Sequence, residues 1–191
     1  MSIRNNAVSC KRIPVAILLI LGTSAALCQL NSNTASVALR ATLGESLTVA
    51  ATPSAVAIPL VAGGTATGTS PVAITTTWVL SASRTAVTLV GYFASATVAL
   101  TDGATTPDNI PASEVLGQVT TGTPTSFTAF TQTAPVGTAG AGLTLFTQGL
   151  SGASRTANRT DNLNLEINLA GQPQLPAGSY TGTLNIQAQA L

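Results

Sequence analysis

Carboxylates are the only conventional catalytic groups in most of this chain. The sequence contains no histidine, and its single lysine, Lys11, and both cysteines, Cys10 and Cys28, lie within the first 28 residues. The rest of the chain therefore lacks an imidazole base, an amine nucleophile and a thiolate. Six carboxylates remain: Glu45, Asp102, Asp108, Glu114, Asp161 and Glu166. They are scattered over expected loops and outward strand positions, so we predict a protein without catalytic activity.

Two loops contain residue types that are found in ligand sites. Asp102, Asp108 and Asn109 could supply oxygen ligands to calcium, but their spacing matches no EF-hand loop, and the same residue types form turns. The glycine-rich run 63–71 lacks the lysine and the following helix of a phosphate-binding loop. We therefore predict neither a metal site nor a cofactor.

Three aromatic residues, Trp78, Tyr92 and Tyr180, are the candidate ligand contacts. Trp78, the only tryptophan, could stack on a sugar or fill the core between two sheets. Its neighbours on the same face of the expected strand, Ile74 and Leu80, are apolar, which favours the core. The three aromatic residues motivate a glycan as one possible partner.

Charge is unusually scarce. Charged residues make up 7% of the chain, against about 25% in an ordinary soluble protein. Beyond residue 28 the chain has four arginines and six carboxylates, hence a net charge of four minus six, or −2. Such a surface offers no electrostatic footprint for nucleic acid. A weakly charged surface rich in threonine instead favours self-assembly or packing in a coat, or reflects a composition bias of an extracellular protein.

Residues 1–28 have the pattern of a signal peptide. Arg4, Lys11 and Arg12 precede the apolar run 13–21, which is too short to span a bilayer, and small residues follow. The pattern allows cleavage after Ala26 or after Cys28. We favour this interpretation over a lipoprotein anchored at Cys28, because Leu27 is a poor residue before an acylated cysteine. The expected mature chain, 29–191, is then secreted or displayed at the cell surface, with no membrane span and no internal disulfide.

The clearest strand pattern lies near the end of the chain. From Asn162 to Leu169 large aliphatic residues alternate with polar residues, as in a strand with one buried face. A second alternating run begins at Tyr180, and we expect the two to pair as antiparallel neighbours. Further strands are expected at 74–80, at 87–93 in a central position, and around Phe127, Phe130 and 143–146. These patterns predict one all-β domain, an antiparallel β-sandwich.

Several local features complete the prediction. The alternating run Val37 to Leu43 should form a first strand that continues through Val49 after a bend at Gly44, and 56–60 a short second strand. Residues 63–71 should form a loop. Ser113 could cap a single helical turn. The sequon at Asn158 is expected in a polar loop, where Arg159 is close enough to pair with Asp161.

Two segments carry a family resemblance: Trp78-Val79-Leu80 and the run from Pro176 to Leu184. The second resembles the closing segment of bacterial surface proteins such as WxL-type cell-wall proteins, spore-coat-U-like proteins and pilin subunits. The resemblance implies a secreted, immunoglobulin-like sandwich with a structural or adhesive role. Pilins also have a groove that a neighbour's strand completes, and Val37 to Leu43 could be such a donor, although we favour its role as the domain's own first strand.

Together these observations predict a secreted or cell-surface structural or adhesive protein that could self-assemble, in a pilus or a coat. Its expected partners are itself or other surface proteins. The alternative is an extracellular module that binds glycan or cell-wall polymer through Trp78, Tyr92 and Tyr180.

Overall fold

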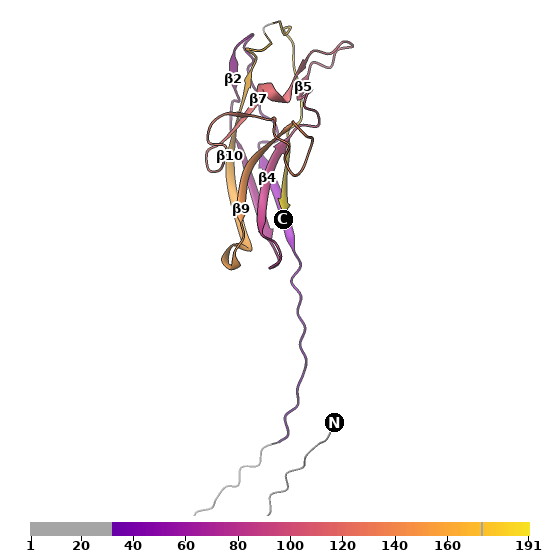
Figure 1. Ribbon diagram of the computed structural model, residues 1–191, viewed down its shortest axis with the longest axis vertical. Coiled ribbons are helices and arrows are strands. Elements are labelled where there is room, and N and C mark those ends of the chain that lie inside the picture. Colours follow the sequence, from indigo (N-terminus) through magenta and orange to yellow (C-terminus); the bar gives the residue numbers. More distant parts are fainter. Residues whose placement is uncertain (1–31, 173) are drawn as a thin grey trace, which may run out of the picture. The chain divides into compact units, whose positions relative to one another are not determined.

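The computed structural model describes residues 32–172 and 174–191 (Figure 1). The expected signal peptide, residues 1–28, lies outside them. The chain divides into two units, 1–41 and 42–191. The described part of the first unit, residues 32–41, is exposed and contains no strand or helix. All strands of the described residues belong to the second unit. Among the described residues, no helix has the length and apolar character needed to cross a membrane.

The second unit is built from two main antiparallel sheets. The larger sheet has the order β1-β3-β10-β7-β8, with β2 also paired to β10. Its strands are β1 (Ser46–Thr52), β2 (Thr65–Thr67), β3 (Val72–Val79), β7 (Val115–Val119), β8 (Thr128–Ala129) and β10 (Thr156–Asn168). The smaller sheet has the order β11-β4-β9, with β4 (Ala86–Tyr92), β9 (Gly142–Gly149) and β11 (Asn185–Ala190). A short hairpin pairs β5 (Leu100–Thr101) with β6 (Asn109–Ile110).

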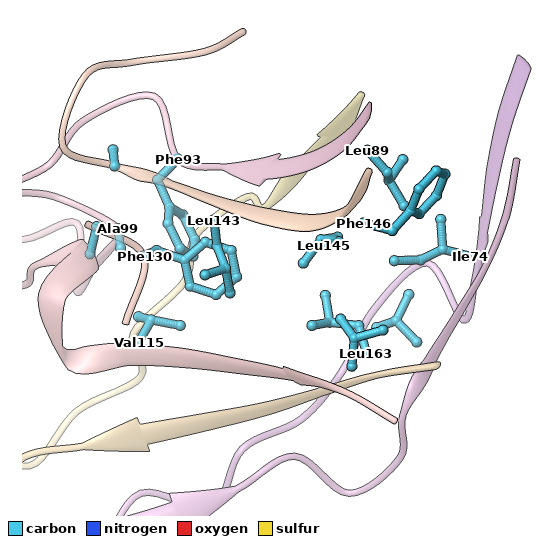
Figure 2. Close-up of a cluster of buried hydrophobic side chains, with 14 of the residues drawn as sticks. Ile74, Leu89, Phe93, Ala99, Val115, Phe130, Leu143, Leu145, Phe146 and Leu163 are labelled. Atoms are coloured by element: carbon cyan, nitrogen blue, oxygen red, sulfur yellow. The ribbon is translucent and has the colours of Figure 1, made fainter. Parts of the chain in front are cut away.

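The hydrophobic core lies between the two sheets. Ile74 and Leu163 contribute from the larger sheet, and Leu89 and Phe146 approach them from the smaller one (Figure 2). Within β10 the alternation has the expected effect, because Leu163 and Ile167 are buried while Asn162 is exposed. The central position of β4 is also confirmed. The structure therefore confirms an all-β, antiparallel sandwich.

The predicted pairing of the last two strands is wrong. β11 pairs with β4 in the smaller sheet, whereas β10 pairs with β2, β3 and β7 in the larger one. The physical reason is that a period of two fixes which face of a strand is buried and leaves its neighbour open.

Five local predictions also need correction. The first strand begins at Ser46, and residues 37–43 form no strand. Residues 56–60 have no ladder partner, while β2 forms at Thr65–Thr67 inside the expected loop. Asn158 lies within β10 rather than in a loop. The turn at Ala112–Glu114 follows Pro111 as N-cap residue and has no side-chain cap bond.

Candidate docking groove

β1 and β11 form one side of the sandwich, which we call the open seam. Each is the outermost strand of its sheet, and the two pack beside each other without a hydrogen-bonded ladder (Figure 1). Arg84 joins the start of β1 to the end of β11: it forms an ion pair with Glu45 at 3.3 Å and donates to the Ala190 carbonyl at 3.5 Å. The start of β1 and the end of β11 therefore share one end of the sandwich, so the two strands run in opposite directions.

An apolar groove opens in this seam, where β1 ends and β11 begins. Its volume is about 310 Å³, roughly twice that of an engineered apolar cavity that binds benzene. Its rim includes Ala51, Val56, Leu184 and Ile186, and its floor reaches core residues such as Val115. Within the described part of the chain, no charged side chain lines the groove. Such a surface favours an aliphatic occupant.

The seam beside the groove is apolar too. Leu47 and Val49 of β1, and Ala188 and Ala190 of β11, are only partly buried although they pack against the core. The groove therefore continues as a stripe of half-covered aliphatic side chains along both edge strands.

The backbone of β11 adds hydrogen-bonding capacity to this stripe. β11 forms a ladder with β4 on one side, and no described strand pairs with its other side. In an antiparallel ladder, alternate residues direct their N–H and C=O groups away from the partner. The outer edge of β11, apart from the Ala190 carbonyl that already accepts from Arg84, can therefore accept a further strand.

The segment 37–43 has a complementary pattern of side chains. Val37, Leu39 and Leu43 are 82%, 90% and 86% exposed. Large aliphatic residues with this exposure and alternation indicate a segment whose apolar face would be buried if it paired as a strand.

The three predicted aromatic residues lie in separate environments. Trp78 is buried at 2% exposure, and its indole N–H donates to the Ser154 carbonyl at 2.8 Å. The half-buried Tyr92 donates to the side-chain carbonyl of Gln187. Tyr180 donates to the Pro176 carbonyl at 2.9 Å. The structure therefore does not gather these rings into one stacking surface.

The ionisable groups with shifted pKa values are perturbed by their immediate neighbours. Desolvation, with Asp108 and Asp102 nearby, raises the pKa of Tyr180. The backbone N–H of Ser81, and then Arg84, lower the pKa of Glu45 to about 2. The described residues contain no group of three or more carboxylate, histidine or cysteine side chains that could hold a metal ion.

No family model, curated protein or solved structure matches this chain. Function is therefore inferred from the geometry. Sequence reasoning missed the groove because its walls come from distant segments, around Ala51 to Ile58 and around Gly182 to Ile186. The sequence feature that could have pointed to a docking site is the run Val37 to Leu43, because its alternating aliphatic residues would bury one face against a partner.

Proposed function

We propose that this chain is a structural or adhesive protein of the cell exterior, without catalytic activity, whose copies associate through the open seam. The observation that carries the proposal is the uncharged apolar groove between two edge strands, each of which is paired on one side only. Burial of aliphatic surface there would drive association, and addition of a strand to β11 would supply backbone hydrogen bonds.

The edges themselves support self-association. Proteins that remain monomeric commonly protect sheet edges with charged side chains, proline or bulges. Neither β1, with the sequence SLTVAAT, nor β11, with the sequence NIQAQA, contains a charged residue or a proline. The low charge of the whole chain also removes a repulsion that would keep copies apart.

The glycan-binding alternative has less support. Sugar stacking needs an exposed aromatic face, and Trp78 is 2% exposed. Tyr92 and Tyr180 are partly accessible, but the hydroxyl of each already bonds within the chain.

Two matched variants test the proposal. Ala51 is exposed and lines the groove, whereas Ala50 is exposed on the opposite face of the same strand. Sedimentation velocity of the mature protein over a range of concentrations should show assembly of the wild type and of Ala50→Lys. Ala51→Lys should sediment as a monomer with an unchanged far-ultraviolet circular dichroism spectrum. Equal assembly of both variants, or a monomeric wild type at millimolar concentration, would overturn the proposal.

A further inference from the structure

We infer that the open seam is closed by a second copy of this chain, with β11 of one molecule paired antiparallel to β11 of the other across a two-fold axis. This inference rests on the proposed self-association and adds the pairing strand, the symmetry and the register of the contact. Four properties of β11 carry it: its free backbone groups, its amide side chains, its lack of charge and its position beside the groove.

The free backbone groups of β11 belong to alternate residues. Ala86 and Leu191 exchange backbone hydrogen bonds at 2.9 and 3.4 Å, at one end of the ladder between β4 and β11. From this pair the register continues without a shift through β11, and inward and outward residues alternate along an antiparallel ladder. The N–H and C=O groups of Ile186, Ala188 and Ala190 therefore point away from β4.

These groups favour one register for a symmetric pair. The Ala190 carbonyl already accepts from Arg84 at 3.5 Å, so within the described structure both outward groups are free only at Ile186 and Ala188. A two-fold, antiparallel pair can set Ile186 of each copy opposite Ala188 of the other, and each such pair exchanges two backbone hydrogen bonds. The two-fold axis then passes between the two Gln187 residues, which lie opposite each other.

The side chains on the outer face of β11 are amides that can pair with their own kind. In this register Gln187 faces Gln187, and Asn185 faces Gln189 of the other copy. An amide side chain both donates and accepts hydrogen bonds. The Gln189 side-chain carbonyl is buried and accepts no hydrogen bond from a described residue, a state that costs free energy. The side-chain amide of Asn185 in the second copy lies opposite this residue and can donate to it.

The lack of charge on this edge also fits a second copy. A two-fold axis sets the groups near it against their own counterparts, so a charged edge would face a like charge. β11, with the sequence NIQAQA, contains no charged residue, and no described charged side chain lines the groove. Such an edge gives no attraction to an acidic or basic partner and no repulsion between two copies.

The same contact covers the apolar stripe. Pairing of the two β11 edges brings the open seams of the two copies face to face. Each seam contributes partly buried aliphatic side chains, among them Leu47 and Val49 of β1 and Ile186 of β11. Burial of these side chains supplies the apolar part of the association, while β11 supplies the backbone hydrogen bonds.

The contact is closed. The smaller sheet of each copy has the order β11-β4-β9, so pairing through β11 joins the two sheets into one continuous antiparallel sheet with β9 at both ends. Each copy uses its one β11 edge in this contact, and a two-fold contact presents the same surface on both subunits. Association through the seam therefore stops at a dimer.

Single cysteines test the register of the pair. In a background of Cys10→Ser and Cys28→Ser, Gln187→Cys should form a disulfide between two copies under mild oxidation. Opposed residues of a non-hydrogen-bonded pair lie about 4.5 Å apart at Cα, which a disulfide can span. Gln189→Cys is the control on the same face: it lies more than about 13 Å from its own counterpart, so it should form a disulfide only with a co-expressed Asn185→Cys chain.

Two outcomes of this experiment would overturn the inference. One is the absence of a disulfide in Gln187→Cys at a concentration at which the wild type associates. The other is an equal yield of disulfide from Gln187→Cys and from Gln189→Cys, each expressed alone.

Charges placed at the axis test the symmetry. Gln187→Lys alone and Gln187→Glu alone should each weaken association by about tenfold or more, since each sets like charges face to face. An equimolar mixture of the two variants should restore association. Gln187 is exposed, so both variants should keep the far-ultraviolet circular dichroism spectrum of the wild type. A mixture that associates no better than either variant alone would contradict the two-fold pairing.

Sedimentation velocity separates this inference from the proposed function. The wild type should form a dimer and no larger species. If Ala51→Lys is monomeric and Ala50→Lys associates, but the wild type grows beyond a dimer or the Gln187 variants fail their tests, the seam has another occupant and only this inference fails. If the wild type stays monomeric at millimolar concentration, both fail.

Discussion

The two sides of the sandwich, where its sheets end, are built differently. Opposite the open seam, β7 and β8 face β9 across what we call the closed seam. There the Thr123 N–H donates to the Leu145 carbonyl at 3.2 Å, and Gln132 and Gly142 exchange backbone hydrogen bonds at 2.8 and 3.0 Å. Short connections thus tie the larger sheet to the smaller one. No described bridge of this kind joins β1 to β11.

A buried ion pair strengthens the closed seam. Asp161 is fully buried and accepts two hydrogen bonds from Arg159, at 2.7 and 2.8 Å, and one from the Thr121 hydroxyl at 2.7 Å. Arg159 also lies 4.6 Å from the ring centre of Phe146, on the other sheet. Among the described residues, the open seam has a single exposed ion pair, between Arg84 and Glu45 at one end of it. One side of the sandwich is thus hydrogen-bonded within the chain, whereas the other side leaves two edge strands that are each paired with one neighbour only.

The largest expected effect is the loss of stability when a buried aromatic residue near the closed seam is truncated. The matched comparison is truncation of an aliphatic residue on the groove rim of the open seam. Phe130 is fully buried and packs edge to face on Phe93 at 5.2 Å, so Phe130→Ala should lower the free energy of unfolding by about 3–5 kcal/mol. Ile186 on the groove rim is only half-buried, so Ile186→Ala in the dilute monomer should cost about 1 kcal/mol. Urea unfolding of both variants measures the difference. Equal losses would show that the open seam is as well packed as the rest of the core.

The second-largest expected loss of stability comes from breaking the ion pair between Arg159 and Asp161 at the closed seam. Asp161→Ala leaves Arg159 facing the core without its carboxylate, and breaking a buried pair costs about 3 kcal/mol. Asn158→Ala, on the exposed face of the same strand, should change the free energy of unfolding by less than about 0.5 kcal/mol. Urea unfolding at neutral pH measures both. Similar values for the two variants would contradict the structural role of Asp161.

The smallest expected effect comes from Glu45, which accepts from the Ser81 N–H and pairs with Arg84 at one end of the open seam, and this effect depends on pH. The folded state lowers the pKa of Glu45 from 4.5 to about 2. The carboxylate therefore contributes to stability above about pH 4.5, and this contribution is lost as the pH falls toward 2. Melting temperatures measured between pH 6 and pH 2 should fall less steeply for Glu45→Gln than for the wild type. Parallel curves for the two proteins would exclude Glu45 as a source of the pH dependence.

The sequence predicted the faces of the strands well and their partners poorly. The alternation in β10 placed Leu163 and Ile167 in the core, because the period of two is a local property of an extended chain. The pairing of β11 with β4 depends on contacts between distant segments. β2 was missed because three residues, Thr65, Ala66 and Thr67, carry too little pattern to be recognised.

The same limit explains the run Val37 to Leu43. Its alternation predicts a strand with a buried apolar face but does not say which chain covers that face. The groove could not be predicted because its walls are separated by more than a hundred residues. The pairing of Arg159 with Asp161 was predictable, since residues two apart in a strand lie on the same face.

Hydrogen exchange tests the central claim, association through the open seam, most directly. Amides on the outer edge of β11 should exchange rapidly in the dilute protein, where no described strand pairs with that edge. At concentrations that favour assembly, these amides should become protected, while the amides of β9 and β10 exchange at unchanged rates. Assembly without any new protection in β11 would contradict the account.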